Sequence, residues 1–232
     1  MKKITAALLC VMLVISTSVT AFGATKNDVK EKIDTAVAFA FDGNYSKNGY
    51  DVSASKNLYI LAQSGADISA FAADYFKSVS DAAAAGTLTD AGVIGMAVTI
   101  AELAGADPEN INGTDLTNML KNADPGAVST PYNYFYAIEA AVNHGMKDTA
   151  AAFSNALAKY YVPGTGTDFW NGYGTSPDDL AMFILAMETA GAYTEYTKDA
   201  FEILETFATP DGYSNYGANA DSTALALAAC AA

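Results

Sequence analysis

Apolar residues follow helical spacing along almost the whole chain, and no stretch alternates between apolar and polar positions as a half-buried strand would. The pattern predicts about ten helices and no sheet, so the chain is expected to be all-α. The helices are expected at residues 27–41, 53–64, 67–85, 89–104, 108–122, 131–144, 147–161, 177–190, 194–208 and 220–232.

Four of these helices end on a glycine at a nearly constant interval. Gly65, Gly105, Gly145 and Gly191 are separated by 40, 40 and 46 residues. A glycine just past the last helical turn adopts positive φ without steric cost, so it closes the helix and lets the next one begin within a few residues. The spacing indicates an internal repeat of helical hairpins.

Three other sites carry a start signal. Asp107-Pro108, Thr130-Pro131 and Ser176-Pro177 each place a capping side chain before a proline. Proline is favoured at the first helical position because the N–H that it lacks has no intrahelical partner there. A helix is therefore expected to begin at each of these prolines.

Several of these helices are rich in alanine and glycine and carry little side-chain volume. A single hairpin of this kind cannot bury a core of its own, so consecutive hairpins are expected to stack. Five stacked hairpins can curve into an open or closed ring of paired helices. The last predicted helix, 220–232, lacks a stop signal. Either the ring is naturally short or it continues downstream.

The N-terminus has the features of an export signal. Lys2 and Lys3 precede an apolar run over 4–15 and a small-residue cleavage site that ends at Ala24. That run is shorter than the roughly 20 residues that a permanent membrane span requires. The sequence therefore predicts a signal peptide over 1–24, a secreted domain over 25–232 and no stable membrane insertion.

The mature chain is strongly acidic. Without the signal it has 10 lysines and 26 acidic residues, a balance of 10 − 26 = −16, and it contains no arginine. Nucleic acid and anionic membranes are poor partners for such a surface. Removal of Cys10 with the signal leaves Cys230 alone, so no internal disulfide is expected.

Two segments before the last inner helices align with each other: 169–181 lies over 212–224, with Asp178 over Asp221. This element resembles the loop-to-helix element of the terpenoid-cyclase and protein-prenyltransferase α/α-toroid superfamily. Residues 107–120 resemble, more narrowly, a connection in secreted Gram-positive toroid proteins related to the α-barrel domain of transcobalamin. The resemblance implies an α/α toroid and, as one ligand, a corrinoid.

The catalytic motifs of that superfamily are incomplete in this chain. The cyclase Asp-x-Asp-Asp element is reduced to Asp178-Asp179, and the prenyltransferase zinc ligands could only come from His144 and Cys230. As a pair of acids, Asp178 and Asp179 could still act as acid and base. Their position after Ser176 equally favours helix capping.

The one calcium-loop-like stretch, 107–115, has its glycine at the seventh position instead of the sixth that an EF-hand requires. Turn and cap chemistry is the simpler interpretation of this stretch. His144 near a helix end needs no functional role. No metal site and no required cofactor are therefore expected.

Aromatic residues gather in the last two loops, with Trp170, Tyr173, Tyr213 and Tyr216 as candidates for ligand binding. In a ring of helices these loops could share one mouth, although they could also simply fill gaps between helices. We expect a secreted, non-catalytic toroid module that binds a small molecule or glycan, or acts at the cell surface. A toroid enzyme of terpene cyclase-like or polysaccharide-active type using Asp178 and Asp179 is the alternative, and a structural spacer beside a partner domain is a third.

Overall fold

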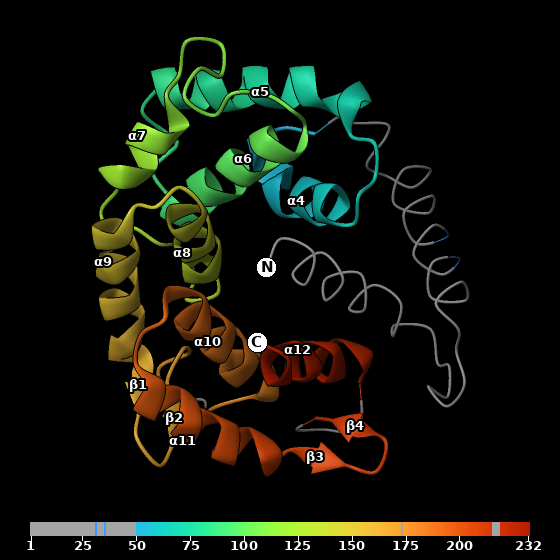
Figure 1. The fold of residues 1–232 in the computed structure, drawn as a ribbon, viewed down its shortest axis with the longest axis vertical. Helices are drawn as coiled ribbons and strands as arrows, with labels where there is room; N and C mark the ends of the chain where they lie inside the picture. Colours follow the sequence, from blue (N-terminus) through green and yellow to red (C-terminus); the bar gives the residue numbers. More distant parts are fainter. Residues whose placement is uncertain (1–30, 32–34, 36–49, 173, 215–218) are drawn as a thin grey trace. The chain divides into compact units, whose positions relative to one another are not determined.

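The computed structural model describes residues 31, 35, 50–172, 174–214 and 219–232, and this part of the chain is mostly helical (Figure 1). Its α-helices, numbered as in Figure 1, are α4 (Ser55–Gln63), α5 (Ser69–Ala84), α6 (Ala91–Leu103), α7 (Leu116–Lys121), α8 (Asn133–Asn143), α9 (Lys147–Leu157), α10 (Pro177–Ala190), α11 (Thr194–Glu205) and α12 (Ala220–Cys230). Two short 3-10 helices cover Val52–Ala54 and Ala158–Tyr160. The prediction of an all-α protein is confirmed.

Two sequence predictions fall outside this description. The signal peptide over 1–24 and the helix over 27–41, apart from residues 31 and 35, belong to parts of the chain that the structure does not describe. Among the described residues, no helix has both the length and the hydrophobicity needed to span a bilayer.

The chain divides into two units. The described residues of unit 1 are 31, 35, 50–88 and 97–116, and those of unit 2 are 89–96, 117–172, 174–214 and 219–232. In unit 1, Leu58, Tyr59 and Tyr75 are fully buried. The Tyr75 hydroxyl lies 2.8 Å from the Ser55 hydroxyl in this core, so its polar atom is satisfied without solvent.

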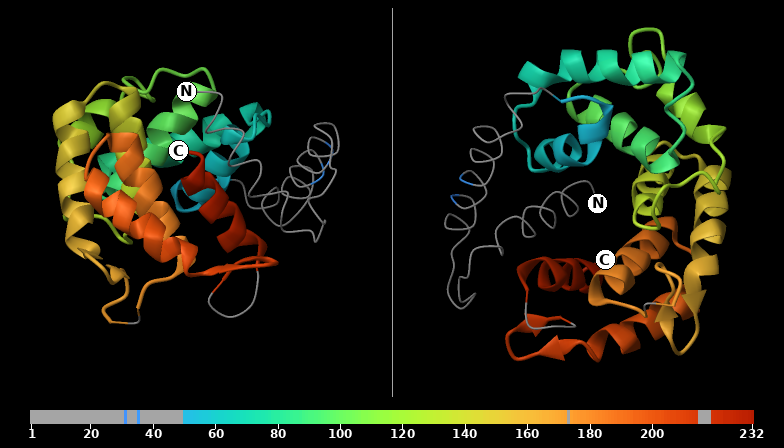
Figure 2. Two further views of the ribbon diagram at one scale, coloured as in Figure 1. Left: turned by 60° about the horizontal axis from the view of Figure 1, so that its bottom comes forward. Right: turned by 180° about the vertical axis from the view of Figure 1, so that it is seen from behind.

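Unit 2 consists of two helical layers. Helices α8, α10 and α12 form one row, because α10 packs against both of the others. Helix α9 packs against α8 and α10, and α11 packs against α10, so both lie on the same side of that row (Figures 1 and 2). Helices of the two layers therefore alternate along the chain in this unit, as hairpin stacking requires.

The four repeat glycines all close helices in the expected way. Gly65, Gly105, Gly145 and Gly191 have φ values of 80°, 75°, 68° and 63°. At each one, the N–H of the following residue donates to a carbonyl five residues back, as Met146 does to Ala141 over 2.8 Å. This is the Schellman arrangement, so the predicted repeat of glycine-closed helices is confirmed.

The predicted helix over 108–122 is wrong in its first half. Residues 108–115 form a turn with an isolated bridge between Ile111 and Thr114, and α7 begins only at Leu116. Asn112 and Gly113 both have positive φ, at 51° and 86°, which is the conformation of a type I′ turn and not of a helix. Local turn chemistry at Asn-Gly therefore overrides the start signal at Pro108.

Of the three proline start signals, only Ser176-Pro177 begins a helix as expected. Helix α8 starts at Asn133, and its preceding residue makes no side-chain cap. The Thr130-Pro131 step instead forms part of a turn.

The structure also contains strands that the pattern does not predict. Residues Tyr161–Val162 (β1) pair with Gly166–Thr167 (β2), and Ala208–Thr209 (β3) pair with Gly212–Tyr213 (β4), as two antiparallel ribbons. Each strand has only two residues, which is too short for a period of two to be visible in the sequence.

These ribbons recur at equivalent places in the chain. One follows α9 and precedes α10, and the other follows α11 and precedes α12. In each ribbon a backbone N–H donates to a threonine hydroxyl near the start of the following helix: Thr167 to Thr175 over 3.3 Å, and Tyr213 to Thr223 over 2.9 Å. Twice in unit 2 the chain therefore runs from a helix of one layer, through a ribbon, to a helix of the other layer.

The start of α6 lies in backbone contact with α8 within unit 2. A Cβ atom built on Gly95 would lie 2.8 Å from the carbonyl carbon of Tyr136 and 3.0 Å from the Cα of Ala137. One on Gly92 would lie 2.5 Å from the Cβ of Asn133. Because real Cβ atoms do not approach this closely, both positions require glycine.

Candidate functional site

The first turns of three helices meet at one end of unit 2. Tyr132, which precedes α8, donates a short hydrogen bond to the Oδ1 atom of Asp179 in α10. Ser222 in α12 hydrogen-bonds Asp178, the neighbour of Asp179. The residues that start α8, α10 and α12 therefore lie together, which places the loop before α10 and the first turn of α12 at the same end.

A complete capping box starts α10. The Ser176 hydroxyl accepts from the N–H of Asp179 over 3.1 Å, and the Oδ2 atom of Asp179 accepts from the N–H of Ser176 over 3.2 Å. Both helix N–H groups that would otherwise lack partners are thereby satisfied, and a carboxylate sits at the positive end of the helix. This is the capping role that the Ser-Pro-Asp-Asp segment indicates.

Asp179 also accepts hydrogen bonds from side chains outside its own helix. It is almost completely buried, with 1% of its surface exposed, and its Oδ1 atom accepts from Tyr132 and, over 3.4 Å, from the indole Nε1 of Trp170. The Trp170 N–H also lies within hydrogen-bond reach of the Tyr132 hydroxyl. Burial, and then the hydrogen bond to Asp179, raise the pKa of Tyr132, so this phenol remains a donor.

Trp170 is fixed in place yet open to solvent. The Trp170 residue is 43% exposed. The centroid of its ring lies 5.9 Å from that of the Tyr132 ring, and its indole N–H donates to Asp179. The Phe169 side chain next to it is buried and packs edge-on against Tyr132, with ring centroids 5.7 Å apart. A large aromatic surface is thus held rigidly at the protein surface, which lowers the entropy cost of binding a ligand there.

Asp178 differs from its neighbour in its hydrogen bonding. Its Oδ1 atom is buried, and no hydrogen-bond partner for it is found among the described residues. Burial raises the pKa of Asp178, the Ser222 hydroxyl opposes that rise, and the charges of Asp179 and Asp221 add to it. The side chain therefore keeps its proton to a higher pH than an ordinary aspartate, which is the state that a general acid requires.

The other predicted aromatic residues are placed as follows. Tyr213 lies in β4, and burial together with Cys230 and Glu205 raises its pKa, so its hydroxyl lies toward the far end of α12. Its described contacts do not include Trp170. Tyr173 and Tyr216 lie outside the described residues. Only Trp170, of the four predicted binding residues, is described at the meeting point of the helix starts.

Tyr132 is the site residue that the sequence interpretation missed. In the sequence it is one of several aromatics near the start of a predicted helix, and nothing marks it as a partner of residues 38 to 47 positions later. The Thr130-Pro131 turn places its side chain beside Trp170 and Asp179. No local pattern reveals this contact.

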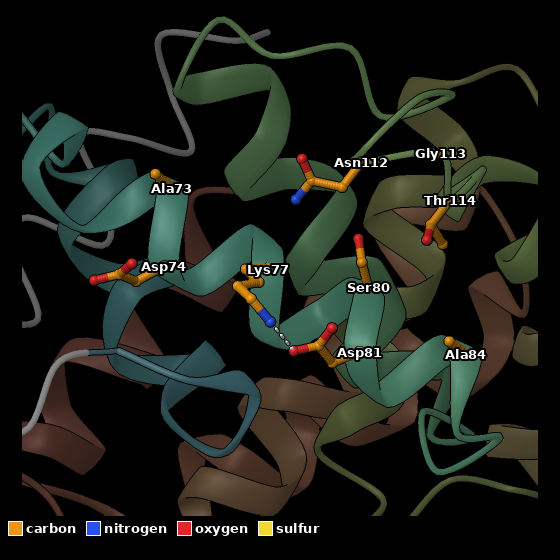
Figure 3. A pocket seen from close by; sticks show the side chains of 9 residues that line it. All are labelled: Ala73, Asp74, Lys77, Ser80, Asp81, Ala84, Asn112, Gly113 and Thr114. Carbon is orange, nitrogen blue, oxygen red and sulfur yellow. Dashed lines mark hydrogen bonds and ion pairs between the residues drawn. The ribbon is translucent and has the colours of Figure 1, made fainter.

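A groove lies on unit 1 between α5 and the turn at residues 112–114. It has a volume of about 660 Å³, and one side is the α5 face that carries Lys77, Ser80 and Asp81 (Figure 3). Residues 112–114 form the other side, and Lys77 pairs with Asp81 at 2.5 Å. The lining combines charged side chains with small ones, and its ion pair between Lys77 and Asp81 is exposed.

The remaining candidates show no assembled chemistry. Cys230 is a free and exposed thiol, and the carboxylate of Asp107 accepts from the N–H of Glu109 over 3.0 Å as part of its turn. Within the part of the chain that the structure describes, no three histidine, cysteine, aspartate or glutamate side chains group in a way that could hold a metal ion.

Comparison with models of protein families, with curated proteins and with solved structures finds no match to this chain. What the protein does must therefore be inferred from the site itself.

Proposed function

We propose that this chain is an exported, non-catalytic module of the α/α-toroid type that binds a large organic ligand through the aromatic surface around Trp170. The observation that carries the proposal is the combination of exposure and fixation at Trp170. Trp170 is 43% exposed, and its indole N–H donates to a buried carboxylate. An accessible ring held in this way suits contact with a bound ligand.

In unit 2 the helices alternate between two layers along the chain, and this alternation supports the proposal that the chain is of the toroid type. Toroids of this type stack helical hairpins so that the inner helices start at one rim, and here the starts of α8, α10 and α12 lie together. A rim made from such starts would present Trp170 to a ligand. Small-angle scattering of the mature protein would test the ring, since a straight stack would give a longer maximum dimension.

The bonding of Asp179 supports a binding role over catalysis. Its two oxygens are occupied by the capping box, Tyr132 and Trp170, and the side chain is buried. A buried carboxylate that is hydrogen-bonded through both oxygens holds the aromatic surface in place.

Titration of the purified mature protein with corrinoids and with oligosaccharides would test the proposal. Trp170 is the single tryptophan of the chain, so its emission reports on this surface alone. Calorimetry should accompany the emission measurement for corrinoids, which absorb light. We expect saturable binding that Trp170→Ala abolishes and that Leu227→Ala, a change at another exposed hydrophobic residue, leaves intact. Binding that survives in Trp170→Ala would contradict the proposed surface.

A toroid enzyme remains the second candidate because of Asp178. Its raised pKa suits a proton donor, and no partner for its Oδ1 atom is found among the described residues, whereas Asp179 is hydrogen-bonded to Tyr132, Trp170 and Ser176. Replacing Asp178 by Asn separates the two candidates. An enzyme would lose turnover while keeping its fold, whereas a binding module would still bind its ligand.

A further inference from the structure

The described polar atoms at the edge of the Trp170 ring are bonded to one another. The indole N–H and the Tyr132 hydroxyl both donate to Asp179, and the Asp168 carboxylate accepts from the N–H of Gly172 over 2.6 Å. A ligand at this surface therefore meets a ring face beside donors that are already bonded. A sugar, whose hydroxyls need several hydrogen-bond partners, is poorly matched to such a surface.

The charge around the ring is negative. Asp179 bonds to the edge of the indole, and both Asp178 and Asp179 act electrostatically on the adjacent Tyr132. No lysine or arginine lies between Lys121 and Lys147 or between Lys159 and Lys198, the segments that supply these side chains. A carboxylate that accepts from the indole N–H adds electron density to the ring, which strengthens the attraction of its face for a cation.

We propose that the ligand group recognised by Trp170 is an organic cation of the quaternary ammonium type, an inference that rests on the function proposed above. Such a group makes no hydrogen bonds, so the occupied polar atoms cost it nothing. Its positive charge complements the nearby carboxylates and the balance of −16 in the mature chain, and tryptophan is the side chain whose face attracts cations most strongly. The contact would be made on the exposed part of the ring.

The test uses choline and its uncharged isostere 3,3-dimethylbutan-1-ol, which has the same shape without the charge. Choline is expected to change Trp170 emission saturably and to bind about five- to thirtyfold more tightly than the isostere. Raising the salt concentration should weaken the binding of choline and leave that of the isostere unchanged, because only choline is attracted by charge.

Variants locate the contact. Saturation-transfer NMR on the choline methyl groups does not depend on tryptophan emission, and it should show affinity falling from wild type to Trp170→Phe to Trp170→Ala. Leu227→Ala is the control and should match the wild type. Circular dichroism melts establish that each variant is folded, and Trp170→Phe keeps a ring at the site if the alanine variant is unstable.

Equal affinity for choline and the isostere, or no saturable response to choline, would overturn the inference. If choline fails this test but oligosaccharides or corrinoids bind at Trp170, the proposed binding function stands and only the inference of a cationic ligand is overturned. If no ligand binds, both proposals fail.

Discussion

Substitution of Gly95 by alanine tests the backbone contact between α6 and α8. The added Cβ would lie 2.8 Å from the carbonyl carbon of Tyr136, whereas non-bonded carbons normally sit about 3.5–4.0 Å apart. Because the obstructing atoms belong to a helix backbone, no side chain can rotate away. The two helices must separate, and overpacking of this kind costs about 1–3 kcal/mol.

Helix propensity acts in the opposite direction. Alanine is favoured over glycine in a helix interior by about 1 kcal/mol, so propensity alone would make Gly95→Ala more stable. A contact this close is expected to cost about 3 kcal/mol, the upper end of the overpacking range, and helix propensity offsets about 1 kcal/mol of that. The free energy of unfolding should therefore fall by about 2 kcal/mol, or roughly 4–8 °C in Tm for a chain of this size. The sign of the change therefore distinguishes the two effects.

Urea denaturation followed by circular dichroism at 222 nm and by Trp170 emission would measure this loss. Ala151→Gly, on an exposed position of α9, is the matched control and should cost about 1 kcal/mol through propensity alone. If Gly95→Ala proved as stable as the wild type or more so, the close approach of α6 to α8 would be refuted.

Three further predictions concern single side chains. Gly145→Ala should cost about 1 kcal/mol, measured by urea denaturation, because its φ of 68° lies in the left-handed region while the space around it is open; an unchanged midpoint would contradict that strain. Asp90→Ala should cost about 2–3 kcal/mol, because its carboxylate caps the start of α6 and also accepts from the N–H of Ser129 over 2.7 Å; Asp90→Asn should retain at least part of this stability. In Asp178→Asn the effect should depend on pH. Burial raises the folded-state pKa of Asp178, so the folded wild type binds its proton more tightly than the unfolded chain, and its free energy of unfolding falls as the pH rises from about 4 through that raised pKa. Thermal melts from pH 3.5 to 7 should show the Asn variant gaining stability relative to the wild type as the pH rises, and a constant difference would rule out the raised pKa.

Local signals predicted most of the helical structure. The range 177–190 is reproduced by α10, because Ser176 and Pro177 start it and Gly191 closes it, all through contacts within a few residues. The four glycine-closed helices follow for the same reason. Where two local signals competed, as at Pro108 and the Asn112-Gly113 turn, the sequence alone did not show which would prevail.

The candidate site was only partly predictable. Trp170, Asp178 and Asp179 were identified from a short segment in which aromatic residues precede a capped helix start. The segment left two roles open for Asp179, and the contacts with Tyr132 and Trp170 give it a capping and anchoring role. Those contacts link α8 to α10, so they depend on how hairpins pack.

By itself, the sequence determined that the chain is mostly helical, where four helices close on a glycine and where α10 begins, because caps and positive-φ glycines act over three or four residues. Only the tertiary structure decided which helix starts meet, why Gly92 and Gly95 must lack a side chain, and that Tyr132 joins Trp170 at Asp179. These are contacts between residues 9 to 47 positions apart, and their geometry is set by the packing of whole helices rather than by any local pattern.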